Sequence, residues 1–111
     1  MDKLTNYKNI VKEFLSEIAS WKNQFPEIET QLLIDEERNH YQILNVGWRN
    51  SERTYGVSIH IDIKNDKIWI QRNATDLLIG EMLVEKGVPK EDIVLAFHPP
   101  YKRPYSGFAA A

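Results

Sequence analysis

His60 and Asp62 are the two residues of this sequence whose types and spacing could support chemistry. They lie two positions apart in a run of alternating apolar and polar residues, so both side chains should project from one face of a β-strand. There they could act as an acid–base pair or supply two ligands to a metal ion. An alternating strand produces such polar pairs by default. We therefore expect His60 and Asp62 to be exposed, and we expect their replacement by alanine to leave the fold and partner binding largely intact.

Other signals of catalysis are absent from the sequence. Neither His40 nor His98 stands at a diagnostic ligand spacing from that pair, and the chain has no cysteine. There is no phosphate-binding loop, no paired-glycine fingerprint and no serine in a sharp strand-to-helix turn. We therefore expect a protein that is not an enzyme, without catalytic residues, cofactor or metal. A small enzyme that uses His60, Asp62 or His98 remains an alternative, because active sites also assemble from distant residues.

The composition is that of a globular protein with little positive charge. The 111 residues are 42% hydrophobic and 27% charged, with a net charge of -2, which suits a single domain over residues 1–111. Since lysine and arginine supply most of the affinity for phosphates, we expect no tight binding of DNA by the chain alone. The lack of cysteine, of an export signal and of a long apolar run indicates a cytoplasmic protein without a membrane segment.

Two helices are predicted by apolar residues that recur at helical spacing. The first spans Lys3 to Trp21, and Pro26 prevents its continuation. The second lies around Leu77 to Lys86, with Thr75 as its N-terminal cap. Gly87 can take the left-handed conformation that ends a helix in a Schellman motif.

Strands are predicted where apolar and polar residues alternate. The clearest run extends from Tyr55 to Ile63, and two-residue turns at 50–51 and 65–66 would pair it with both neighbours in antiparallel register. Residues 28–34 join this sheet with their apolar side chains on the core face if the loop before the next strand has an odd number of residues, such as 37–39. The fold class is therefore α+β: an N-terminal helix on an antiparallel meander of about four strands, then a second helix and a short strand or extended tail.

This register puts aromatic and apolar side chains on the sheet face away from the core. Such an exposed patch marks a partner site more often than a catalytic one. The alternatives are that the tail or second helix covers the face, or that two copies of the chain form a homodimer through it. The tail from His98 is rich in proline and aromatic residues and adds further candidates. The predicted partner-binding residues are Tyr41, Ile43, Trp69, His98, Tyr101 and Arg103.

Three stretches carry a pattern that resembles the XisI family of excision-controlling factors. They read DEERNHYQILNVGW (35–48), YGVSIHIDIKNDKIWIQRNATD (55–76) and LVEKGVPKEDIVLAFHPPYKRPY (83–105). The resemblance implies a regulatory protein of cyanobacterial type that controls excision of the fdxN DNA element during heterocyst development. It also implies an XisH-like protein as partner, while a separate recombinase cuts and rejoins the DNA. An antitoxin-like inhibitor that masks a nuclease-like XisH partner by mimicking DNA charge is the alternative.

Overall fold

A five-stranded sheet in the order β1-β2-β3-β4-β5 organises the chain, whose computed structural model describes residues 2–21 and 25–111. The elements are α1 (Lys3–Ala19), β1 (Ile28–Asp35), β2 (His40–Arg49), β3 (Glu52–Lys64), β4 (Lys67–Asn73), α2 (Ile79–Glu85), η1 (Lys90–Asp92), β5 (Ile93–Leu95) and η2 (Arg103–Tyr105). The first four strands are antiparallel, and β5 pairs in parallel with β4 after α2. The predicted α+β fold is confirmed, with β5 as a fifth strand.

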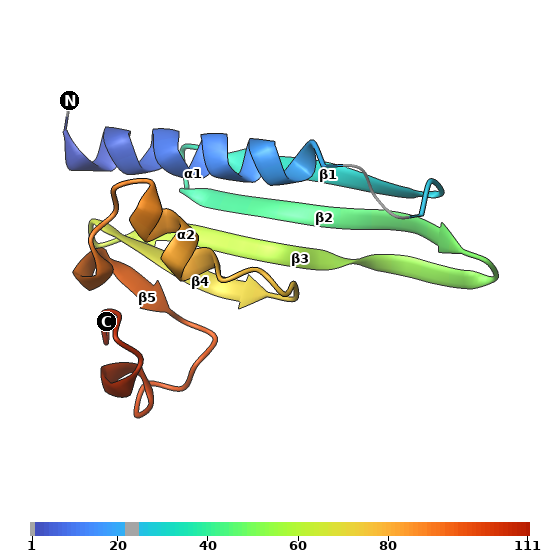
Figure 1. Cartoon of the computed structure of the whole chain (residues 1–111). Helices are drawn as coiled ribbons and strands as arrows, with labels where there is room; N and C mark the ends of the chain where they lie inside the picture. The colour runs from blue at the N-terminus through green and yellow to red at the C-terminus, as the bar shows by residue number, and fades with distance from the viewer. Residues whose placement is uncertain (1, 22–24) are drawn as a thin grey trace.

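Both helices pack on one face of the sheet, as Figure 1 shows. Helix α1 contacts β1, β2 and β3, while α2 contacts β4. Side chains from both helices and from β2 to β5 meet there in one apolar core. Its buried members are Tyr7, Val11, Phe14, Leu15, Tyr41, Ile43, Ile59, Ile61, Ile63, Ile68, Ile70, Ile79, Leu83, Val88 and Ile93. Within the described residues, no helix combines the length and apolar content needed to cross a membrane.

The helix ends follow from local hydrogen bonds. Asp2 caps α1, because its carboxylate accepts a hydrogen bond from the N–H of Thr5 at 2.7 Å. Helix α2 begins later than predicted, since Thr75 closes a turn ahead of it by accepting from the N–H of Leu77 at 3.1 Å. The predicted end of α2 is confirmed: Gly87 has φ 103°, and the N–H groups of residues 87 and 88 donate back into the last turn.

The hairpin turns agree with the sequence pattern in two of three cases. The two-residue turns at 50–51 and 65–66 are confirmed, with Asn50, Asn65 and Asp66 in the left-handed conformation that such turns require. The first hairpin has a four-residue loop, because Asp35 pairs with His40, so the predicted odd loop is wrong.

The pairing of β2 with β3 contains a one-residue shift that the alternating pattern does not reveal. Leu44 pairs with Val57 as expected, but the preceding residue, Ile43, pairs with Ile59. Ser58 is therefore an extra residue on β3, and the two strands form a β-bulge there. From the bulge toward the start of β2, every pair differs from the predicted one.

This bulge moves two predicted partner-binding residues into the core. Tyr41 pairs with Ile61, and the exposed fractions of Tyr41 and Ile43 are 0% and 2%. Their predicted position on the sheet face away from the core is wrong. A shift of one residue exchanges the two faces of a strand, so the bulge alone accounts for the difference.

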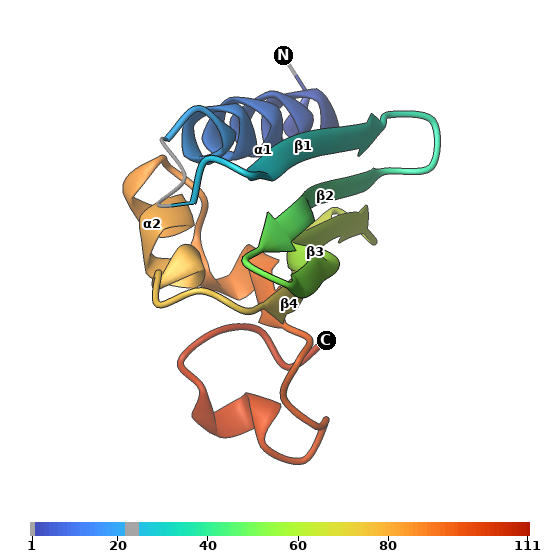
Figure 2. The same cartoon turned by 90° about the vertical axis from the view of Figure 1, so that its right-hand side faces the viewer.

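The C-terminal segment, residues 98–111, lies beyond β4, at the opposite end of the molecule from α1 (Figure 2). The N–H of Ala109 donates to the carbonyl of Ile93 at 2.8 Å, and Ala109 forms a β-bridge with Val94. Arg103 extends its guanidinium over the ring of Trp69, at 5.8 Å from the ring centre. The segment is thus bound to β5 at Ala109, and its Arg103 covers Trp69 on the second sheet face.

Trp69 is buried under this cover, with 7% of its surface exposed. Its indole N–H donates to the carbonyl of Lys64 at 3.0 Å, and the Lys64 ammonium lies 4.0 Å from the ring centre. The predicted side of the sheet is correct, because Trp69 pairs with Asp62. Its predicted exposure is wrong, and the alternative that the tail covers this face holds for Trp69.

Candidate functional site

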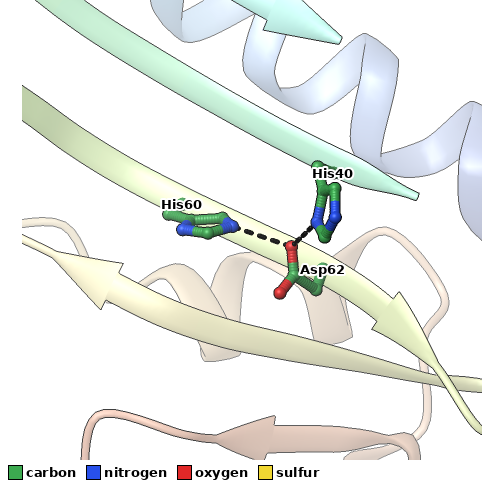
Figure 3. Close-up of side chains that lie close together, drawn as sticks. All are labelled: His40, His60 and Asp62. Carbon is green, nitrogen blue, oxygen red and sulfur yellow. Dashed lines mark hydrogen bonds and ion pairs between the residues drawn. The ribbon is translucent and has the colours of Figure 1, made fainter. Parts of the chain in front are cut away.

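Three polar side chains converge on the sheet face opposite the helices (Figure 3). The carboxylate of Asp62 lies between two imidazole rings: its Oδ1 is 2.7 Å from Nδ1 of His40 and 2.7 Å from Nε2 of His60. Gln71 donates to the other carboxylate oxygen at 3.2 Å. The expected pair of His60 and Asp62 is present, and it belongs to a larger cluster.

The strand pairing explains why His40 joins this cluster. His40 is the first residue of β2 and pairs directly with Asp62 on β3. Without the bulge at Ser58, His40 would stand opposite Ile61 and point toward the core. The expectation that His40 forms no motif with the pair is therefore wrong, and the signal that reveals it is the bulge, not the spacing along the chain.

The electrostatics of the cluster centre on an ionised carboxylate. Burial raises the pKa of Asp62, whose side chain is 16% exposed, but the hydrogen bonds from His40 and His60 outweigh burial and lower this pKa below its ordinary value. An ionised carboxylate only accepts hydrogen bonds, so each ring donates from the nitrogen that faces it. The predicted exposure of Asp62 is thus also wrong, because three donors surround it.

The other predicted site residues lie in the C-terminal segment. Tyr101 is 72% exposed and fits a contact with a partner. His98 stacks beside Phe97, with 4.6 Å between the ring centres, and is not among the residues of the His–Asp cluster within the described chain. Arg103 is partly buried, since its guanidinium donates to the carbonyls of His98 and Ala96 at 2.9 and 3.2 Å.

Comparisons with known proteins cover almost the whole chain. A family model described as XisI protein matches residues 1–110. The crystal structure of a XisI-like protein from Anabaena variabilis is 48% identical, with a TM-score of 0.92 over 97% of this chain and 99% of that chain. The crystal structure of the fdxN element excision controlling factor XisI from Anabaena variabilis is 36% identical, with a TM-score of 0.86 over 99% and 100% of the two chains. No curated protein matches the sequence.

Proposed function

Because this chain belongs to the XisI family, we propose that it regulates excision of a DNA element by binding a protein partner and not by catalysing a reaction. The observation that carries the proposal is its similarity, over 99% of the chain, to a protein described as the fdxN element excision controlling factor. On this proposal the partner is an XisH-like protein, the role belongs to heterocyst development, and the protein acts in the cytoplasm, where the DNA is.

The C-terminal segment offers a surface suited to such a partner. Tyr101 and Tyr105 are 72% and 88% exposed. They flank Arg103, whose guanidinium holds this part of the chain in place by hydrogen bonds to the carbonyls of His98 and Ala96. Tyrosine is enriched at protein interfaces and among the residues that dominate their affinity. A segment that is already held in place loses little conformational freedom on binding, which favours tight association.

The charge of the chain supports an indirect action on DNA. The net charge is -2, and binding of duplex DNA draws its affinity largely from lysine and arginine that displace counterions from phosphates. We therefore assign DNA recognition to other members of the assembly. This chain contributes a protein contact that allows those members to act.

A binding titration tests this proposal. The purified chain is titrated at about 0.15 M salt, separately against an XisH-like protein and against duplex DNA from the ends of the element. We expect saturable binding of the protein only. Tyr101→Ala should weaken that binding about tenfold or more if Tyr101 is an interface anchor. Tyr55→Ala is the matched control, because Tyr55 is 69% exposed and pairs with Val46 near the β2–β3 turn. This turn lies away from the C-terminal segment (Figure 1).

Two results would contradict the proposal. Submicromolar affinity for DNA without any partner would show that the chain recognises DNA directly. An absence of binding to the XisH-like protein would contradict the proposed partner. The nuclease activity of the partner, measured with and without this chain, separates regulation from an antitoxin-like role. Suppression of such an activity would favour the antitoxin-like alternative.

A further inference from the structure

The cluster of His40, His60 and Asp62 has the donor atoms of a transition-metal site. Two imidazole nitrogens and one carboxylate oxygen form a set that suits Zn²⁺ and its first-row neighbours. One ligand atom from each of the three residues lies within 4.8 Å of the other two. Mg²⁺ and Ca²⁺ prefer oxygen ligands, so the two nitrogens select against them.

Two of the three distances between these atoms, the two that involve Asp62, are close to those around a bound ion. Four ligands at about 2.0–2.1 Å from Zn²⁺ in tetrahedral geometry are about 3.3 Å apart. Each ring nitrogen now stands 2.7 Å from the carboxylate oxygen of Asp62. Both contacts therefore need to lengthen by about half an ångström. Binding requires rotation of the His40 and His60 side chains, which must also bring their ligand nitrogens, now within 4.8 Å of each other, to about 3.3 Å. The paired backbones of β2 and β3 keep the three positions together.

The surroundings hold the carboxylate in a suitable orientation. Gln71 donates to Oδ2 of Asp62 at 3.2 Å and leaves Oδ1 facing both rings. Partners of this kind orient metal ligands and strengthen binding in known sites. The side chain of His40 is 50% exposed and that of His60 is 27% exposed, so an ion can enter from solvent. A fourth coordination position stays open on the surface.

From this geometry we propose that His40, His60 and Asp62 bind one divalent transition-metal ion, with Zn²⁺ as the representative, on the open face of the sheet. The ion takes the place of the two ring protons that now point at the Asp62 carboxylate. Water or a side chain from a bound partner completes the coordination. The inference goes beyond the proposed regulatory role and does not depend on it, since the site is made entirely by this chain.

Titration of the isolated chain with Zn²⁺ tests the inference. We expect one ion bound per chain by isothermal calorimetry and a rise in the thermal unfolding midpoint, because a ligand that binds only the folded state stabilises it. Mg²⁺ at the same concentration should have neither effect. Co²⁺ should give the visible absorption bands of nitrogen- and oxygen-coordinated cobalt.

Variants identify the ligands. His60→Gln keeps a polar side chain of similar reach but lacks the ring nitrogen, and it should weaken Zn²⁺ binding at least tenfold. Gln71→Ala should weaken binding about tenfold through loss of carboxylate orientation. His98→Ala is the control, because His98 lies outside the cluster, and it should bind like the unchanged chain. Circular dichroism confirms that each variant is folded.

The inference is overturned if the unchanged chain binds no Zn²⁺ in calorimetry, or if folded His60→Gln binds as tightly as the unchanged chain. Loss of binding in His98→Ala with retention in His60→Gln would place the ion elsewhere. Because these measurements use the chain without a partner, their failure leaves the proposed regulatory role to its own experiment.

Discussion

The hydroxyl group of Tyr7 on α1 donates a hydrogen bond to the carboxylate of Asp92, 85 positions further along the chain. Lys3 adds an ion pair to the same carboxylate at 2.9 Å. Asp92 is 8% exposed and directly precedes β5, so the first helix is joined to the last strand of the sheet. A buried charge needs partners of this kind, and these contacts therefore help to fix α1 over the sheet.

Replacing Tyr7 with phenylalanine should lower the free energy of unfolding by about 1.5–3 kcal/mol, because it removes a hydrogen bond to a charged acceptor and leaves the ring in place. Urea denaturation followed by circular dichroism measures the change. Tyr105→Phe serves as the control, since Tyr105 is 88% exposed. Equal stability of the two variants would mean that Lys3 alone satisfies Asp92.

The same carboxylate should make stability depend on pH in acid. Burial raises the pKa of Asp92, but hydrogen bonds from Tyr7 and Lys3 outweigh burial and lower it. Because the folded pKa lies below the unfolded value of about 3.9, the stabilisation is complete above that value and is lost as pH falls through the folded pKa. Asp92→Asn should therefore be less stable than the unchanged chain near pH 7, and the gap should shrink below about pH 4. A gap that stays constant with pH would contradict this assignment.

The bulge at Ser58 marks the limit of what the sequence could predict about the site. The alternating residues from Tyr55 to Ile63 predicted β3, its turns and its pairing with β4 near the turn, because spacing along one strand determines which side chains share a face. An extra residue is a property of two strands together. Neither strand alone shows it, so the approach of His40 to Asp62 could not be predicted from spacing.

The cover over Trp69 marks a similar limit. The alternation in β4 correctly placed Trp69 on the face away from the helices. Whether that face is open depends on where residues 98–111 pack, and a segment rich in proline has no periodicity from which its path can be predicted. The pattern of β4 thus predicts the face on which Trp69 lies, but it does not predict that the C-terminal segment covers Trp69.

Trp69→Ala should destabilise the protein by about 3–5 kcal/mol, because it empties a buried site and removes the ring between Lys64 and Arg103. Trp48→Ala is the matched control, since Trp48 is 51% exposed, and it should cost about 1 kcal/mol or less. Chemical denaturation of both variants makes the comparison. A stable, folded Trp69→Ala protein would restore the earlier hypothesis that Trp69 anchors a partner.

Gly47→Ala should also destabilise the fold, because Gly47, on β2, lies against the start of β1. A Cβ atom on Gly47 would lie 2.1 Å from the carbonyl oxygen of Glu27 and 2.8 Å from Cα of Ile28, and neither backbone atom can move cheaply. We expect a loss of more than about 1 kcal/mol. At Gly56, on β3, a Cβ atom meets nothing within 4 Å, so Gly56→Ala should be neutral or stabilising by up to about 1 kcal/mol. Equal effects of the two changes in thermal unfolding would rule out this close approach.

A variant of Arg103 can show whether this residue holds the C-terminal segment in place or contacts the partner directly. Its guanidinium donates to two carbonyls and lies over Trp69, and a lysine has no planar group that could make both hydrogen bonds from one position. Arg103→Lys should therefore loosen residues 98–108 and raise their amide hydrogen exchange about tenfold, the equivalent of about 1.4 kcal/mol. Lys102→Ala, at an exposed neighbouring position, should leave exchange unchanged. If Arg103→Lys weakens binding of the XisH-like protein and raises exchange, Arg103 acts by presenting Tyr101. Weakened binding without faster exchange would instead make Arg103 a direct contact with the partner.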